Sequence, residues 1–163
     1  MFPKILFCVF AIGFFINSSF GIGLSATTPT TKQCPPNSFE SFASSQCYQV
    51  FNDTKYFMDA ELFCMTLGGH LASIHNAFDN MMISGKARQL VGAEAVIFTG
   101  GNNLETPDKW QWMDKTPMNY TDMDYPENDS TNRNCLMIYT VHGRWNYGDC
   151  YVPSPYVCQV ARV

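Results

Sequence analysis

The sequence predicts a small α+β domain held together by disulfides, with two helices followed by short antiparallel strands. Three observations support this fold class. Apolar residues recur at helical spacing in two segments of the first half, and short alternating segments replace them after Val96. A long irregular loop rich in Asn, Asp, Thr and Pro occupies residues 113–134. Six of the seven cysteines follow residue 33, and an even number of cysteines in an exported chain indicates a disulfide framework.

Residues 1–26 predict a secretory signal peptide. Lys4 supplies a positive charge, residues 5–16 form an unbroken apolar run, and polar and small residues follow. The sequence leaves three cleavage points open, after Gly21, Gly23 or Ala26. The alternative is an uncleaved anchor, which we disfavour because a spanning helix needs about 20 consecutive apolar residues and Asn17 interrupts this run. We therefore expect a secreted, extracellular protein with no stable membrane insertion.

Residues 27–33 predict a short extended Thr/Pro linker, and residues 34–163 predict one domain. Removing Lys4 from the 10 basic residues leaves 9 against 14 acidic ones, so the mature chain has a net charge near −5. It has no basic cluster that would neutralise phosphates, so we do not expect it to bind nucleic acid. Three N-x-S/T sequons agree with export and mark glycosylation candidates at Asn52, Asn119 and Asn128.

The helices and the segment before them can be placed from the pattern. Residues 39–51 are aromatic and partly alternating, which predicts a strand or hairpin. Thr54 is the expected N-cap of the first helix, and Gly68 and Gly69 are expected to end it, because glycine takes the left-handed cap conformation without a Cβ clash. The apolar residues of this helix are Phe57, Ala60, Cys64 and Leu67.

A brief buried connection is expected at Leu71, Ala72 and Ile74. Asn76 is then the expected N-cap of the second helix. That helix should run through Phe78, Met81, Met82 and Ile83.

From Val96 onward the helical spacing disappears. Four short strands are expected, over residues 96–99, 110–112, 135–141 and 151–160. Turns are expected at Gly100 and Gly101 after the first of these strands, and at Gly143–Trp145 and Gly148 between the last two.

Several short motifs follow one another in a specific order between Cys34 and Cys158. They are Phe57-x-x-Ala60-x-x-x-Cys64, Gly68-Gly69-x-Leu71-Ala72-Ser73-Ile74, Phe98-Thr99-Gly100-Gly101, Trp110-x-Trp112-x-Asp114, Cys135, Trp145-Asn146-x-x-x-Cys150 and Tyr156-Val157-Cys158. Each motif alone is weak, but the ordered set resembles the C-type lectin-like domain and covers nearly all of the mature chain. The resemblance implies that fold and a role in binding rather than catalysis.

The resemblance also implies the disulfide pairing, which the cysteine count alone leaves open. In the longer variant of the family the pairs would be Cys34–Cys47, Cys64–Cys158 and Cys135–Cys150. Zinc binding is the competing use of cysteine, and we disfavour it because no C-x-x-C pair occurs.

Sugar-binding members of the family hold Ca²⁺ on the long loop, where it needs six to eight oxygen ligands. The family's five ligand positions fall here on Tyr125, Glu127, Arg133, Asn146 and Tyr147. Only Glu127 and Asn146 are plausible ligands, and Arg133 places a fixed cation beside the site. The resemblance therefore implies no cofactor, and the usual calcium site is expected to be lost. A nonstandard calcium site remains a disfavoured alternative, built from Asp122, Asp124, Glu127 and Asp129.

Amphipathic rings in loops suit ligand recognition. The candidates for ligand contact are Tyr120, Tyr125, Glu127, Asn146 and Tyr147.

Other aromatic and histidine residues are interpreted without a binding role. The core residues among them are Trp110, Trp112 and Trp145. Three histidines, His70, His75 and His142, show no metalloprotease spacing and no nucleophile pattern.

The sequence thus predicts a secreted C-type lectin-like protein that binds a glycan or a protein, with a role in recognition or defence. The alternatives are a structural or surface-contacting protein without a discrete small-ligand site and, remotely, an enzyme.

Overall fold

The structure is a computed structural model and describes residues 32–163 except 108 and 125–132. The predicted signal peptide therefore lies outside the described residues, as do Tyr125, Glu127, Asn128 and Asp129. Within the part that is described, no helix is both long and apolar enough to cross a membrane.

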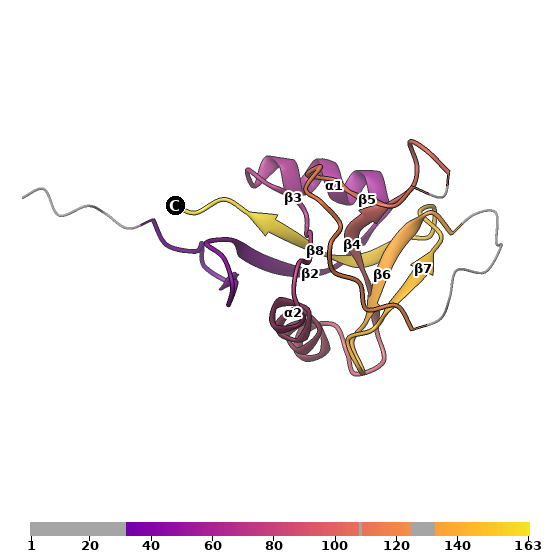
Figure 1. Cartoon of the computed structure of the whole chain (residues 1–163). Helices are drawn as coiled ribbons and strands as arrows, with labels where there is room; N and C mark the ends of the chain where they lie inside the picture. The colour runs from indigo at the N-terminus through magenta and orange to yellow at the C-terminus, as the bar shows by residue number, and fades with distance from the viewer. Residues whose placement is uncertain (1–31, 108, 125–132) are drawn as a thin grey trace, which may run out of the picture. The chain divides into compact units, whose positions relative to one another are not determined.

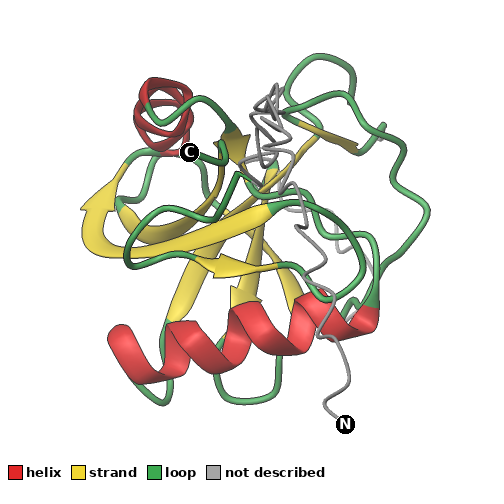
Figure 2. Cartoon of the chain, turned by 90° about the vertical axis from the view of Figure 1, so that its left-hand side faces the viewer, coloured by secondary structure: helices red, strands yellow, loops and turns green. Residues whose placement is uncertain are grey.

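The domain consists of two helices and one mixed sheet, as the α+β prediction required (Figure 1). The elements are β1 (Phe39–Glu40), β2 (Cys47–Lys55), α1 (Phe57–Thr66), β3 (His70–Leu71), α2 (Ala77–Leu90), β4 (Val96–Asn102), β5 (Gln111–Trp112), β6 (Cys135–Tyr139), β7 (Trp145–Gly148) and β8 (Ser154–Val160). The strand order is β1-β2-β8-β4-β6-β7, with β3 paired to β8 and β5 paired to β4. The helices lie on opposite sides of the sheet (Figure 2).

Helix α1 begins differently from the prediction. Thr54 is not its N-cap but belongs to β2, because the pairing of Lys55 with Ser154 keeps this segment extended. The N-cap is Tyr56, whose side chain makes no capping hydrogen bond. The amide of Phe57 instead donates to the carbonyl of Cys150 at 3.1 Å, which satisfies one of the free N–H groups of the first turn.

The predicted end of α1 is confirmed. Gly68 has a φ of 77°, the left-handed conformation that glycine adopts without strain. The amide of Gly68 donates to the carbonyl of Met65 at 3.0 Å, and the amide of Gly69 donates to that of Cys64 at 3.2 Å. These two bonds form a Schellman motif.

Asn76 caps α2 as predicted, since its side chain accepts from the amide of Asp79 at 2.9 Å. The face of α2 that meets the sheet carries Ile83 and Ala87, both fully buried. Phe78 and Met81 lie on the exposed side of the same helix.

The buried carboxylate of Asp79 joins α2 to the segment between β1 and β2. It accepts hydrogen bonds from the hydroxyl of Ser41 at 2.7 Å, the amide of Phe42 at 2.9 Å and the side-chain amide of Asn76 at 2.8 Å. Asp79 is only 2% exposed, and the three hydrogen bonds compensate its buried negative charge. The N-terminal hairpin is thereby fixed to the helix.

The predicted turns at Gly100 and Gly101 are wrong, because both glycines lie inside β4. A Cβ at Gly100 would lie 2.4 Å from the carbonyl oxygen of Leu71, so glycine is required there by a close backbone approach rather than by a turn.

The turn predicted at Gly143 is confirmed by its φ of 77°. The turns predicted at Trp145 and Gly148 are wrong, since the whole segment pairs with β6 as strand β7. The last strand begins at Ser154 rather than at Tyr151.

Two buried clusters form the core, and the predicted core role of Trp112 and Trp145 is confirmed, both being fully buried. These tryptophans lie in the cluster that contains α2. The second cluster contains α1 and the disulfide Cys64–Cys158. All three predicted disulfides are present, the others being Cys34–Cys47 and Cys135–Cys150.

The two ends of the described chain pair with each other. The amide of Gln33 donates to the carbonyl of Val163, and the amide of Val163 donates to that of Gln33, both at 2.9 Å. Arg162 also donates to the carbonyl of Lys32 at 3.1 Å. These bonds extend the sheet edge beyond β2 and β8.

Tyr48 should make the stability of the domain fall at alkaline pH. Burial, with Asp79 and Asp114 nearby, raises the pKa of Tyr48 above its ordinary value, and its hydroxyl donates to the carbonyl of Ser73 at 3.1 Å. In the unfolded chain the phenol ionises near pH 10. The contribution of Tyr48 to the free energy of unfolding is therefore fully present below about pH 10. Above that pH it should decrease by about 1.4 kcal/mol per pH unit.

Urea unfolding at pH 9 to 11 measures this slope. Tyr48→Phe should make the slope less steep by about 1.4 kcal/mol per pH unit, and the remaining slope should come from Tyr156, whose pKa is also raised by burial and by the nearby Asp53. Tyr151→Phe, which changes a tyrosine that is 77% exposed, should leave the slope unchanged. Equal slopes in the wild type and Tyr48→Phe would contradict the assignment.

Candidate functional site

The candidate site is the loop face, defined here as residues 110–124 together with strand β7. At its base lies Trp145, whose indole N–H donates to the side chain of Asn80 at 2.7 Å. The rings of Trp112 and Tyr120 each meet that of Trp145 edge-to-face with centroids 5.5 Å apart. This aromatic cluster anchors the loop to the core.

The backbone of the loop also pairs with β7. The amide of Trp145 donates to the carbonyl of Asp122 at 2.7 Å, and the amide of Asp124 donates to the carbonyl of Trp145 at 2.8 Å. Met123 therefore forms a parallel bridge with Trp145. The long predicted loop thus has a fixed conformation up to Asp124.

Arg144 faces the acidic residues of this loop. Its guanidinium lies 3.9 Å from a carboxylate oxygen of Asp122 and 3.5 Å from one of Asp124, and it donates to the carbonyl of Met123 at 2.9 Å. The ring of His142 lies 3.9 Å from the other carboxylate oxygen of Asp124. A fixed cation between two carboxylates opposes a divalent ion there. The sequence predicted Arg144 only as part of a turn and gave no sign of this contact.

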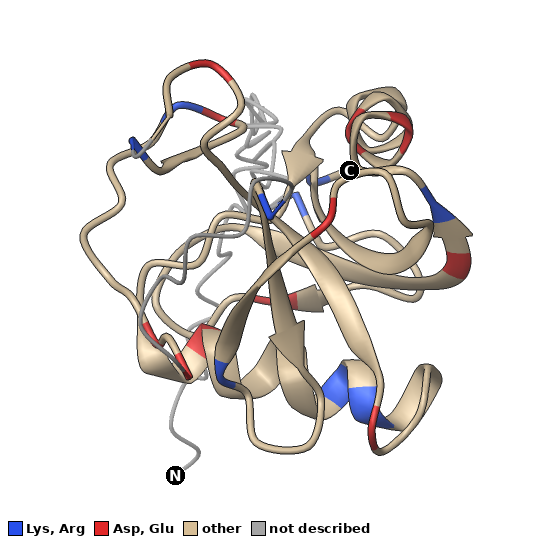
Figure 3. Cartoon of the chain, turned by 90° about the vertical axis from the view of Figure 1, so that its right-hand side faces the viewer, with Lys and Arg blue, Asp and Glu red and all other residues tan. Residues whose placement is uncertain are grey.

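No group of three or more His, Cys, Asp or Glu side chains that could hold a metal ion occurs in residues 32–107, 109–124 and 133–163. Charged residues of both signs are interspersed along the ribbon in the view of Figure 3. Arg133 is exposed and lies just before β6.

Tyr120 points into the domain rather than out of it. It is half-buried against Trp145. Burial, followed by the negative charge of Asp122, raises the pKa of its phenol. In this arrangement the ring of Tyr120 packs the loop onto Trp145.

Asn146 and Tyr147 do not come together. They are neighbours in β7, so their side chains leave on opposite faces of the sheet. The amide group of Asn146 donates to the hydroxyl of Tyr139 at 2.8 Å, and its oxygen accepts from the backbone N–H of Tyr147 at 2.9 Å. The ring of Tyr147 packs on Trp110 with centroids 4.9 Å apart.

An apolar hollow of about 100 Å³ opens beside this aromatic pair. It is lined by Trp110, Met118, Thr121, Met123, Leu136, Trp145 and Tyr147. Among the lining residues that the structure describes, Tyr147 is the only one of our sequence-based ligand candidates. Trp110, which we interpreted as core, is half-buried and lies at the edge of the hollow.

Comparison with known proteins decides what kind of domain this is. The Lectin C-type domain family matches residues 53–160. The chain belongs to the C-type lectin family. The domain is therefore a binding module and not an enzyme, as the resemblance implied.

One relative supports this family assignment, and two solved structures of lower identity support the fold. A C-type lectin mannose-binding isoform of Oxyuranus scutellatus is 32% identical over 119 residues, which cover 69% of this chain and 75% of the relative. Human lithostathine superposes with a TM-score of 0.73 at 18% identity, covering 85% of this chain and 98% of lithostathine. A calcium-independent type II antifreeze protein superposes with a TM-score of 0.70 at 23% identity, covering 83% of this chain and all of that protein.

In this C-type lectin, the five positions of the family's calcium site are only partly described. Asn146 and Tyr147 lie on opposite faces of β7, Arg133 is exposed near β6, and Tyr125 and Glu127 lie outside the described residues.

Proposed function

We propose that this C-type lectin is secreted and recognises a carbohydrate or protein ligand at the loop face, without the calcium ion that the family's sugar-binding members use. The arrangement of β7 carries this proposal. The oxygen of Asn146 already accepts the N–H of Tyr147, and the ring of Tyr147 is directed to the opposite face against Trp110. The two positions that would supply neighbouring ligands are therefore occupied by contacts within the domain.

Contacts to the ligand would come from the aromatic edge of the loop face. Trp110 and Tyr147 line the hollow, with Thr121 as a hydroxyl donor and acceptor beside them. Aromatic rings with a few polar groups nearby suit both sugar rings and apolar protein side chains. The name of the mannose-binding relative supports a carbohydrate ligand, and that of the antifreeze protein supports calcium independence in this fold.

Export is supported by two independent features. The chain begins with a pattern typical of a signal peptide. Its three disulfides are of the kind that forms in an oxidising compartment.

A glycan array of the secreted protein tests the function. We expect binding in the presence of calcium to equal that in the presence of a chelator. Trp110→Ala and Tyr147→Ala should each reduce binding about tenfold or more, the equivalent of about 1.4 kcal/mol, whereas Tyr151→Ala, at an exposed tyrosine outside the loop face, should not. If no glycan on the array binds, but the protein captures a protein partner that neither the Trp110→Ala nor the Tyr147→Ala variant captures, the ligand is a protein. Binding that only calcium permits would contradict the proposal.

Calcium should not raise the melting temperature. An ion that binds only the folded state stabilises it by RT ln(1 + [Ca²⁺]/Kd), about 2.7 kcal/mol at 100 times Kd, which corresponds to several degrees. We expect no shift at millimolar calcium in differential scanning calorimetry, with magnesium as the matched control. A calcium-specific increase that Glu127→Ala abolishes would mean that the acidic loop holds an ion after all.

A further inference from the structure

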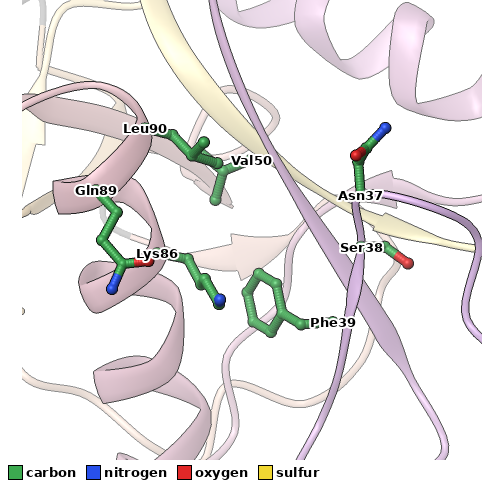
Figure 4. A pocket seen from close by; sticks show the side chains of 7 residues that line it. All are labelled: Asn37, Ser38, Phe39, Val50, Lys86, Gln89 and Leu90. Carbon is green, nitrogen blue, oxygen red and sulfur yellow. The ribbon is translucent and has the colours of Figure 1, made fainter.

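A second hollow lies far along the sheet from the loop face, between α2 and the start of β1. Its volume is about 370 Å³, within the range of small-ligand sites. Figure 4 shows Phe39, Val50 and Leu90 as its apolar side chains, with the ammonium of Lys86 directed towards the Phe39 ring. Gln89, Asn37 and Ser38 add polar groups at the edges. An apolar surface with amide, hydroxyl and ammonium groups around it suits a sugar residue.

Asn52 contacts Leu90, one of the residues that line this hollow. The pairing of β2 is irregular between Phe51 and Lys55, so the side of the sheet that Asn52 faces follows from its contact with α2 and not from alternation along the strand. Its exposed side-chain amide lies 3.4 Å from the carbonyl oxygen of Leu90, at the last turn of α2. Both Val50 and Leu90 line the hollow.

Asn52 is also the first residue of the sequon Asn52-Asp53-Thr54, the acceptor pattern for N-glycosylation. We propose that the glycan on Asn52 folds back into this hollow and fastens β2 to α2. The inference rests on the proposed export, because this modification is made in the secretory pathway. The occupant of the hollow is then the protein's own glycan and not a free ligand.

The chemistry of N-glycosylation is compatible with a glycan that turns back towards α2. The side-chain nitrogen of Asn52 displaces the diphosphate of a lipid-linked oligosaccharide donor from the first sugar carbon and loses one proton. One N–H remains on that nitrogen, and the carbonyl of Leu90, to which this nitrogen donates at 3.4 Å, is an acceptor within reach. The remaining N–H can therefore hold the linkage against the end of α2, with the first sugars beside Leu90 and Phe39.

The other described sequon provides a control. Asn119 is exposed, and its backbone amide donates to the carbonyl of Pro117. It does not line either of the two hollows described above. A glycan on Asn119 would extend into solvent.

The test uses the full chain secreted from eukaryotic cells. Glycopeptide mass spectrometry should find Asn52 occupied. Asn52→Gln should lower the melting temperature by about 3 °C or more, whereas Asn119→Gln should leave it within about 1 °C. Trimming with an endoglycosidase that leaves one sugar should remove the part of the effect that comes from the later sugars beside Phe39.

A second readout depends on Lys86 and not on global stability. Acylation of Lys86 should be several-fold slower in the glycoprotein than in Asn52→Gln, while the exposed Lys109 should react equally in both. An unmodified Asn52 in the secreted protein, an unchanged melting temperature in Asn52→Gln, or equal acylation of Lys86 would each overturn the inference. None of these results would bear on ligand binding at the loop face, so a failure here is separable from a failure of the proposed function.

Discussion

Replacing both Cys64 and Cys158 with Ala is expected to lower the free energy of unfolding by about 4 kcal/mol, the largest effect we expect in this domain. Their disulfide closes a loop with a sequence separation of 94 residues, and the entropy that a cross-link removes from the unfolded chain grows with the length of the loop. Both residues are fully buried in the cluster that contains α1. The melting temperature should fall by roughly 15 °C, and secretion should fall with it.

The paired replacement avoids a free thiol that could pair wrongly. Its matched control is Cys34→Ala with Cys47→Ala, which opens a loop with a separation of only 13 residues and should cost about 2 kcal/mol less. Thermal unfolding of the two purified variants measures the difference. Normal secretion of the Cys64/Cys158 variant, with a melting temperature within a few degrees of the wild type, would contradict the expectation.

Asp79→Ala should have the second largest effect, a loss of about 3 kcal/mol. The substitution leaves the hydroxyl of Ser41 and the amide of Phe42 without their acceptor, and buried donors without partners cost about 1–3 kcal/mol each. The segment between β1 and β2 would then be held mainly by β2 itself. Urea unfolding measures the loss.

Asp79→Asn separates charge from shape, because it keeps one oxygen for Phe42 but turns an amide group towards the donors of Ser41 and Asn76. We expect an intermediate loss. Asp59→Ala, which changes an exposed acid in the first turn of α1, should change stability by less than about 1 kcal/mol. Equal stability of Asp79→Ala and Asp59→Ala would refute the role assigned to Asp79.

The fold was largely predictable because its strongest signals are local or covalent. Asn76, Gly68 and Gly69 mark helix ends through interactions within a few residues, and the ordered motifs implied the three disulfides. The predictions were wrong where contacts between distant segments of the chain determine the local structure. Thr54 is a good cap by type, but pairing between Lys55 and Ser154 holds it in a strand. Gly100 looks like a turn residue, but it is required by the backbone of Leu71.

The candidate site was less predictable, for a related reason. Spacing along the chain placed Asn146 and Tyr147 together, but a strand directs neighbouring side chains to opposite faces. The contact between Arg144 and the acidic loop joins residues some 20 positions apart, and no local pattern marks it. The hollow beside Trp110 likewise arises from the loop folding back on β7. Tyr125 and Glu127 lie outside the described residues and remain predictions.

The pairing of Gln33 with Val163 has a mechanical consequence. A force that separates the two ends peels this pair open one hydrogen bond at a time and then reaches Cys158 in β8. There the load crosses the disulfide to Cys64 in α1. The covalent path of tension therefore bypasses every residue between Cys64 and Cys158, including the loop face. While that disulfide is intact, a tethered molecule can be pulled by its ends without stretching the segment that we propose as the ligand site.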